Sequence, residues 1–472
     1  MRMYVTWPVL VILAIPLAHS QQLDIAINNG RLIDPASATD AVRSLGIQGG
    51  HIAVISEHPL SGRTAIDARR LVIAPGFIDL HSHGQTPENY AFKARDGVTT
   101  ALEMEVGVWP VSSWYSSREG KALVNFGASA GYLPALMQIM RDSGTLVPRD
   151  NAVKRTPSGN EWQQALEHVR EGIREGALGI GLGIAYTPKV SREQIFELFK
   201  LGAERRRCLF VHMRNGGPVE PGVIDALQEV IADAAVTGAS LHVVHITSMG
   251  LGQTAVCLQW IKSAQARGLN VTTEAYPYTA GMTDISSAIF SDGWQARQGG
   301  ITYQDLQWAA TGERLTPELF TRYRSQGGMV AVHSIKEEVV KLAMADPSVM
   351  IASDGILVDG KGHPRAAGSY ARVLGRYVRE EQALTLNEAI RKMALEPAER
   401  LGLTEKGRIA VGADADVTVF DPAKVMDRST YDNPAQYSEG IPFVIVHGTL
   451  VVKDGELQSG ILPGQGIRFA TH

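Results

Sequence analysis

The chain has 472 residues, of which 44% are hydrophobic and 20% charged, and its formal net charge is −4. This composition can bury a large core in more than one domain, and it argues against disorder. No basic excess or Lys/Arg block marks the chain for nucleic acid, and the near-neutral charge gives no reason to expect steering of highly charged partners. The two cysteines, Cys208 and Cys257, lie in apolar periodic segments, so a disulfide scaffold is excluded.

The first residues have the pattern of an export signal. Arg2 precedes an apolar run at 9–15, and the small residues Ala18 and Ser20 follow where a signal peptidase would cut. We predict a signal peptide over residues 1–20 and an exported protein, periplasmic or secreted, without stable membrane insertion after signal removal. A membrane anchor is the weaker alternative, because a span needs roughly 20 apolar residues.

Both ends of the remaining chain have the texture of short β-strands. Alternating apolar segments separated by Gly, Asn and Pro occur at 23–27, 45–47, 52–55, 71–73, 415–420, 443–446 and 450–452. We predict a small β-sandwich domain that is assembled from residues 21–74 and 405–472.

Residues 75–404 alternate apolar strands with helical patterns. The predicted strands lie at 77–81, 99–105, 123–128, 178–184, 209–212, 241–246, 271–275 and 349–353. Helical periodicity follows several of them, as in the apolar stripe within 223–234. These β/α units predict an α/β fold of the TIM (β/α)8 barrel type. An open doubly wound sheet is the alternative, but no Gly-rich dinucleotide fingerprint follows the first strand.

An aromatic-rich stretch at about 284–328 interrupts this alternation between strands seven and eight. It contains Trp294, Tyr303, Trp308 and Tyr323. Because barrel active sites form at the C-terminal ends of the strands, we expect this insertion to act as a lid or substrate wall. A helical subdomain without a role in the site is the alternative.

The first barrel strand ends in a His-x-His pair, His81 and His83. Alternate side chains of a strand share one face, so both imidazoles would project together as potential metal ligands. Other ionisable side chains fall at the same ends of later strands: Glu103, Glu105, His212, His245 and Asp354. Buried ionisable groups need partners, and a pair of divalent metal ions would supply them.

Two further histidines test this assignment. His242 lies three residues before His245, so it is expected to face the opposite side of strand six and to be structural. His333 lies in an apolar run just before strand eight, and its role is left open.

As an ordered set, these residues resemble the amidohydrolase superfamily and, within it, the N-acyl-D-amino-acid deacylases (D-aminoacylases). The resemblance covers nearly the whole mature chain. It rests on residues 74–83 (APGFIDLHSH), 97–100 (GVTT), 212–214 (HMR), 275–278 (AYPY), 353–355 (SDG) and 363–365 (HPR).

The resemblance implies a metal-dependent hydrolase that cleaves N-acyl-D-amino acids to a carboxylic acid and a free D-amino acid. One or two divalent ions, zinc first among them, would be bound. The implied roles are one ion on His81, His83 and Asp354, a second on His212 and His245, and a bridge from strand two. Asp354 would also be the general base and then acid. Tyr276 and Arg365 would hold the α-carboxylate of a small N-acyl amino acid, and the oligomeric state stays open.

The chain departs from the family pattern at three positions. The cysteine that usually ends strand two falls at Val106, so we take Glu105 as the bridging ligand and Glu103 as its alternative. A carboxylate is harder than a thiolate and favours Zn²⁺, Mn²⁺ or Co²⁺. Met282 stands where the family has a carboxylate-binding serine, and Thr247 where some members have a lysine.

Two other functions remain open at this point. The same centre could open cyclic amides or lactones, as in dihydroorotase and hydantoinase relatives. A non-catalytic metal-binding relative is the second alternative, but it would have no need of Asp354 as a proton shuttle.

Overall fold

The structure is a computed structural model that describes residue 3 and residues 22–469. The predicted signal peptide therefore lies outside the described residues except at Met3. In this described part of the chain, no helix combines the length and apolar character needed to cross a bilayer.

The middle of the chain forms an eight-stranded parallel sheet in the order β16-β12-β11-β10-β9-β8-β7-β6. The strands are β6 (Phe77–Asp79), β7 (Val98–Val108), β8 (Asn125–Gly131), β9 (Gly179–Gly183), β10 (Cys208–His212), β11 (Leu241–Val243), β12 (Val271–Ala275) and β16 (Val349–Ile351). The two outer strands meet just beyond their ends, where the Asp354 backbone N–H donates to the His81 carbonyl over 2.7 Å. The predicted TIM-type barrel is confirmed.

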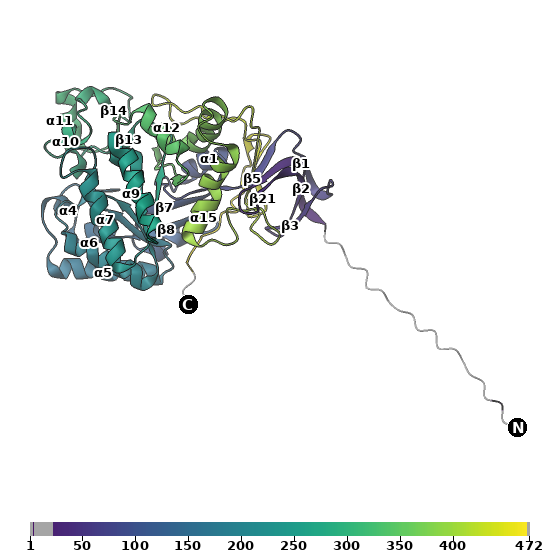
Figure 1. The fold of residues 1–472 in the computed structure, drawn as a ribbon, viewed down its shortest axis with the longest axis horizontal. Helices are drawn as coiled ribbons and strands as arrows, with labels where there is room; N and C mark the ends of the chain where they lie inside the picture. The colour runs from purple at the N-terminus through teal and green to yellow at the C-terminus, as the bar shows by residue number, and fades with distance from the viewer. Residues whose placement is uncertain (1–2, 4–21, 470–472) are drawn as a thin grey trace.

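Helices cover the outside of this sheet (Figure 1). They include α1 (Pro87–Arg95), α3 (Tyr132–Met140), α5 (Gly159–Arg174), α6 (Arg192–Arg205), α7 (Val223–Thr237), α9 (Thr254–Ala266), α12 (Glu337–Ala345), α13 (Arg365–Arg372) and α15 (Glu396–Leu401). Local sequence sets their ends. Ser158 and Glu161 form a capping box that starts α5, and Gly238 ends α7 in the left-handed conformation at φ 74°.

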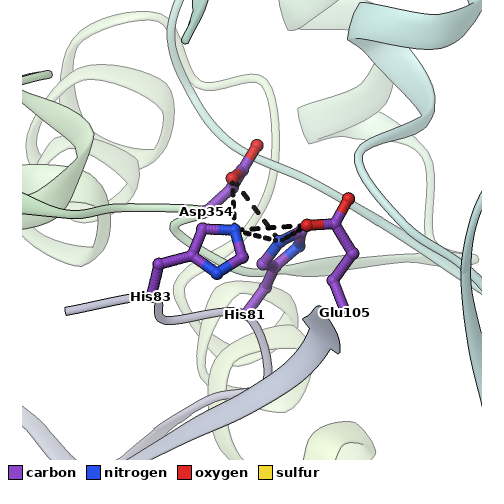
Figure 2. Close-up of side chains that lie close together, drawn as sticks. All are labelled: His81, His83, Glu105 and Asp354. Atoms are coloured by element: carbon purple, nitrogen blue, oxygen red, sulfur yellow. Dashed lines mark hydrogen bonds and ion pairs between the residues drawn. The ribbon is translucent and has the colours of Figure 1, made fainter. Parts of the chain in front are cut away.

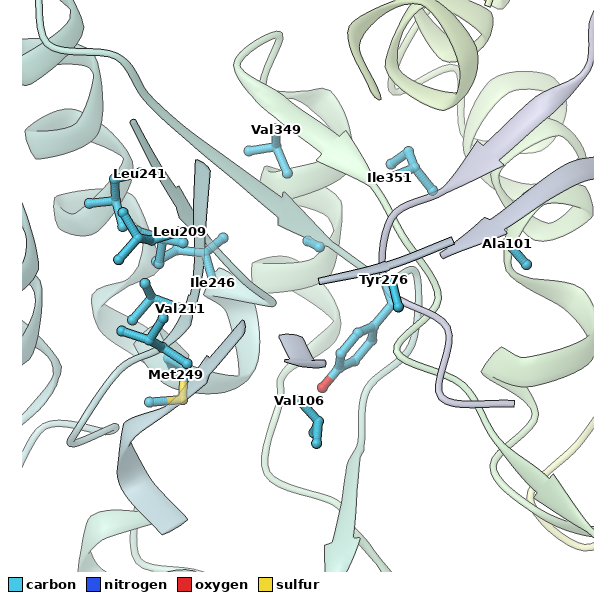
Figure 3. Close-up of a cluster of buried hydrophobic side chains, with 14 of the residues drawn as sticks. Ala101, Val106, Leu209, Val211, Leu241, Ile246, Met249, Tyr276, Val349 and Ile351 are labelled. Atoms are coloured by element: carbon cyan, nitrogen blue, oxygen red, sulfur yellow. The ribbon is translucent and has the colours of Figure 1, made fainter. Parts of the chain in front are cut away.

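Alternation along β10 decides which side chains reach the site. Leu209 and Val211 belong to the large buried cluster shown in part in Figure 3. Phe210 belongs to a different cluster, with residues of β6, β7 and β16, inside the barrel. Because successive side chains of a strand point to opposite faces, His212 follows Phe210 inward at the C-terminal end of the strand.

The two chain ends meet in one nine-stranded sheet, which lies to the side of the barrel in Figure 1. Its strands are β1 (Leu23–Asp34), β2 (Thr39–Gln48), β3 (His51–Ser56), β4 (Gly62–Asp67), β5 (Val72–Pro75), β19 (Val417–Phe420), β20 (Phe443–Val446), β21 (Thr449–Lys453) and β22 (Glu456–Leu457). Antiparallel pairing of β5 with β19 joins the N-terminal to the C-terminal strands. Beyond them the tail returns to the barrel, where the Ile467 backbone N–H donates to the Phe126 carbonyl of β8 over 2.7 Å.

The insertion is a small folded unit. Its sheet has the order β13-β15-β14, with β13 (Gly281–Asp284), β14 (Leu306–Trp308) and β15 (Met329–Val332), and it carries α10 (Trp294–Arg297) and α11 (Pro317–Gln326). Aromatic rings form its core: Trp308 stacks on Tyr323 with centroids 4.1 Å apart, and Trp294 stacks on Phe320 at 5.3 Å. The insertion thus has a hydrophobic core of its own.

Candidate metal centre

Four predicted ligands converge where β6, β7 and β16 lie side by side at the rim of the barrel (Figure 2). Nε2 of His81 and Nε2 of His83 each lie 3.2 Å from Oε2 of Glu105. Oδ1 of Asp354 lies 3.4 Å from the His81 nitrogen and 3.3 Å from the His83 nitrogen. These four side chains, which we call the first donor set, offer four ligand atoms within 4.8 Å of one another.

A second donor set stands on the other side of Glu105. Oε1 of Glu105 lies 2.7 Å from Nδ1 of His212 and 3.1 Å from Nε2 of His245. Glu105 therefore turns one carboxylate oxygen to each set, which is the geometry of a bridging ligand. The alternative, Glu103, instead has Oε2 at 2.8 Å from Nδ1 of His83, the nitrogen that faces away from the centre.

Left-handed backbone conformations bring two of the donors inward. Strand β11 ends at Val243, and His245 follows it with φ 33°. Asp354 follows β16 with φ 52°. Non-glycine residues adopt such φ values at a cost of order 1–3 kcal/mol, and they concentrate at functional sites.

Burial and charge prepare the centre for a cation. Burial alone would lower the pKa of His81, but the carboxylates of Asp354, Glu274 and Glu105 outweigh it and raise that pKa to about 10. Burial alone would raise the pKa of Glu105, yet the His81 imidazole and hydrogen bonds from the second donor set hold it well below its usual range. The carboxylates thus favour positive charge where the ligand atoms meet. Imidazole and carboxylate are ligands of Zn²⁺, so both donor sets fit a divalent ion.

The sequence and the fold are similar to those of known deacylases. The amidohydrolase family profile matches residues 214–452. N-acyl-D-glutamate deacylase of Alcaligenes xylosoxydans xylosoxydans is 32% identical over 91% of this chain and 94% of its own, and D-aminoacylase of the same organism is 29% identical over 92% and 95%. This chain belongs to the amidohydrolase family. Within it, it groups with the N-acyl-D-amino-acid deacylases.

A solved structure supports the grouping of this chain with the deacylases. The crystal structure of N-acyl-D-glutamate deacylase from Bordetella bronchiseptica, complexed with zinc and a phosphonate inhibitor, superimposes with a TM-score of 0.82. It shares 28% identity and covers 95% of this chain and 100% of its own. A dihydroorotase of Syntrophus aciditrophicus is more distant in sequence, at 25% identity over 87% of this chain and 92% of its own.

A cavity of about 470 Å³ opens over both donor sets of this amidohydrolase. Tyr276 and Arg365 line it, as do Met282, Thr283 and Ile289 of the insertion. The insertion is therefore a wall of the cavity, which favours the predicted substrate wall over a remote subdomain.

Arg365 is almost completely buried, with 1% exposure, and contacts a metal donor. Its Nη1 lies 2.8 Å from Oδ2 of Asp354, and its guanidinium stacks on the Tyr276 ring at 4.5 Å. Burial would raise the pKa of Asp354, but Arg365 and the imidazoles, His81 first, hold it well below its usual range. The sequence resemblance did not suggest this ion pair.

Three other positions complete the comparison with the sequence. His242 belongs to neither donor set. The predicted position on the opposite side of the strand is wrong, because Nε2 of His242 lies 3.1 Å from Oε2 of Glu274. Oε1 of the same carboxylate contacts His81, so His242 and His81 lie on the same side. His333 contacts Gln307 at 3.0 Å, outside both sets. Glu274 was not among the site residues predicted from the sequence. An acidic residue within the predicted strand 271–275 could have indicated it, because a buried carboxylate needs a partner.

Proposed function

We propose that this amidohydrolase cleaves the amide bond of N-acyl-D-amino acids, giving a carboxylic acid and a free D-amino acid. The observation that carries the proposal is the shared carboxylate of Glu105 between two donor sets, beneath a cavity that also holds Arg365 and Tyr276. The names of the relatives support the substrate class. Their zinc-containing crystal structure supports zinc as the ion.

Asp354 is the proposed proton carrier. Its Oδ2 is held by Arg365 while its Oδ1 faces the first donor set. A bound divalent ion would supply Lewis-acid chemistry, polarising an amide carbonyl and lowering the pKa of water toward ~7. Oδ1 accepts a proton from the attacking water and returns it to the leaving amine nitrogen, so one water is consumed for each amide bond broken.

Arg365 and Tyr276 are the proposed partners of the substrate's α-carboxylate. Nε of Arg365 has no hydrogen-bond partner in the described part of the chain, and a buried donor needs one. A guanidinium suits a carboxylate both in charge and in shape. The existing pair with Asp354 gives Arg365 a second task, because it also fixes the proton carrier.

The cavity supports substrates with uncharged side chains. Among the described residues that line it there is no lysine, and Arg214 is paired with Glu229 at 2.8 Å. Arg297 donates to the Ser291 carbonyl at 2.9 Å and the Asp292 carbonyl at 2.7 Å. Apolar walls make up much of the remainder: Leu146, Val147, Val219, Met249, Ala288 and Ile289. We expect N-acetyl-D-leucine or -methionine to be cleaved faster than N-acetyl-D-glutamate.

The test is a substrate screen with zinc-loaded protein and with protein treated with a chelator. N-acetyl-D- and L-amino acids, dihydroorotate, a hydantoin and a lactone are compared. Cleavage of D-amides that chelation abolishes and zinc restores supports the proposal. Full turnover without metal contradicts it, and turnover of ring substrates alone favours the ring-opening alternative. Binding of metal without turnover of any substrate favours a non-catalytic relative.

We also propose that the enzyme is exported. The support is the signal-like pattern in residues 1–20. N-terminal sequencing of protein from the periplasmic or secreted fraction should begin at Gln21. An intact Met1 in the cytoplasmic fraction would contradict export.

A further inference from the structure

The cavity over the two donor sets is polar on one side and apolar on the other. The residues that line it after β10, β11 and β16 include the polar or charged side chains of Arg214, Ser248 and Arg365. Among the described residues, those that line it after β8 and β9 have no charged side chain: Leu146, Val147, Ala185, Tyr186 and Pro188. We call these five residues the apolar sector.

The apolar sector begins at the metal ligands and ends at the protein surface. The ring of Tyr186 lies beside that of His212, with centroids 4.9 Å apart. Its hydroxyl is paired with Oγ1 of Thr283 at 3.1 Å, so it does not make the sector polar. Leu146 is half-buried and Pro188 is exposed, so the sector reaches from the second donor set to solvent.

Strand order determines which groups face this sector across the cavity. In a closed barrel of eight strands, strands that are four places apart stand opposite each other. β12 therefore faces β8, and β16 faces β9. Tyr276 directly follows β12, and Arg365 begins α13 after β16. The two proposed carboxylate anchors thus lie opposite the apolar sector.

A substrate that is held by these anchors must extend across the metal centre. Its α-carboxylate lies at Arg365 and its amide lies over the donor sets, so its acyl group points to the apolar sector. An acetyl group would leave most of this surface without contact. The cavity of about 470 Å³ is also in the size range of pockets for drug-sized ligands, about 300–1,000 Å³, and an N-acetyl amino acid is much smaller than such a ligand.

We propose that the apolar sector binds the acyl group, and that the preferred substrates carry apolar acyl groups larger than acetyl, such as hexanoyl or phenylacetyl. One water cleaves the same amide bond, and the products are an apolar carboxylic acid and a free D-amino acid. Each methylene group that moves from water onto apolar surface favours binding by about fourfold. This inference rests on the proposed function, because it takes the α-carboxylate to be held at Arg365.

The experiment measures kcat/KM of the zinc-loaded full chain on N-acyl-D-leucines that differ only in the acyl group. The groups are acetyl, butyryl, hexanoyl, octanoyl, phenylacetyl and succinyl. From acetyl to hexanoyl, kcat/KM should rise by about one to two powers of ten. The rise from hexanoyl to octanoyl should be smaller, because the sector opens to solvent. Succinyl has as many carbons as butyryl but ends in a carboxylate, so it should be cleaved more slowly than butyryl.

Two variants change the sector itself. Leu146→Ala removes apolar surface and should lower the ratio of kcat/KM for hexanoyl to that for acetyl by about three- to tenfold. Ala185→Phe fills the sector and should abolish the advantage of hexanoyl, while the acetyl substrate is still cleaved. Circular dichroism of each variant checks the fold.

Ile356→Ala is the matched control. Ile356 is also apolar, half-buried and part of the cavity wall, but it follows β16 on the side of the anchors. Its replacement should change kcat/KM for hexanoyl and acetyl by the same factor.

Three results would overturn the inference: acetyl as the best acyl group of the wild type, a hexanoyl-to-acetyl ratio that neither Leu146→Ala nor Ala185→Phe lowers, or a ratio that Ile356→Ala lowers as much as they do. A wild type that cleaves none of the N-acyl-D-leucines would instead contradict the proposed function.

Discussion

The rim of the barrel and the insertion line the same cavity but are built in opposite ways. At the rim, ionisable side chains from strands far apart in sequence lie within 2.6–3.4 Å of one another. The insertion packs aromatic rings from within its own segment, as in the Trp308–Tyr323 stack. The rim therefore depends on closure of the whole barrel, whereas the insertion is a local unit. We infer that the rim carries the chemistry and the insertion adjusts the shape of the cavity.

The largest effect is expected at the rim, from Asp354→Asn. An amide cannot accept the proton of the attacking water, and general acid–base catalysis typically contributes ~10²–10⁴-fold. The turnover number for an N-acetyl-D-amino acid should fall by that factor, while circular dichroism shows the fold retained. A variant with half the wild-type activity would show that Asp354 does not carry the proton.

Glu105→Gln should follow, with a loss of bound metal. Glu105 offers one oxygen to each donor set, so its charge is lost from both positions at once. Glu103 touches the centre only through His83, so Glu103→Gln should lower the metal content less. Elemental analysis of the two variants purified side by side decides the order. The reverse order would transfer the bridging role to Glu103.

Arg365→Met should lower kcat/KM for a substrate with a free α-carboxylate by about one to two powers of ten. Charge-assisted hydrogen bonds contribute roughly 1.5–3 kcal/mol. Because Arg365 also pairs with Asp354, its replacement can lower kcat/KM without any loss of substrate binding. The same variant is therefore also measured on the methyl ester of the substrate. The loss on the ester reports the released Asp354, and the additional loss on the acid reports the carboxylate contact. Equal losses on both would remove Arg365 from substrate binding.

Sequence patterns predicted the barrel and placed most of the rim, because strand ends can be read from apolar runs. They could not separate Glu103 from Glu105, which have the same parity on one strand. The structure separates them by their contacts, since Glu105 reaches both donor sets whereas Glu103 reaches only the outer nitrogen of His83, and the register of β7 against β8 is irregular between Glu103 and Val108. Backbone irregularities of this kind have no signature in the hydrophobic pattern.

The position of His242 and two ion pairs were also not predictable from the sequence. His245 was predicted to lie in a strand that in fact ends at Val243, so alternation along that strand could not place His242 relative to His245. The pairs of Arg365 with Asp354 and of Glu274 with His81 join side chains through space. Local pattern gives the ends of elements, but it does not show which charged groups meet.

The smallest effect is expected at the edge of the insertion, at His333, which directly follows β15. Burial, with Arg314 adding to it, lowers the pKa of this imidazole from 6.5 to about 4. Between these values the unfolded chain binds a proton that the folded chain does not, so His333 lowers the free energy of unfolding as pH falls from 6.5 toward 4. His333→Gln removes this dependence, and loss of the hydrogen bond to Gln307 costs about 1 kcal/mol at any pH.

Thermal unfolding of the wild type and His333→Gln at pH 7 and pH 5 tests this sign. The variant should have the lower melting temperature at pH 7. The difference in melting temperature should be smaller at pH 5, because only the wild type is destabilised by protonation of His333 in its unfolded chain. The same comparison with His58→Gln, an exposed histidine of the β domain, controls for general effects of acid on the protein. Because His333 lies outside both donor sets, zinc content at pH 7 should be unchanged in His333→Gln. A gap that widens in acid would show that His333 is protonated in the folded insertion, and loss of zinc would show that the insertion is not independent of the rim.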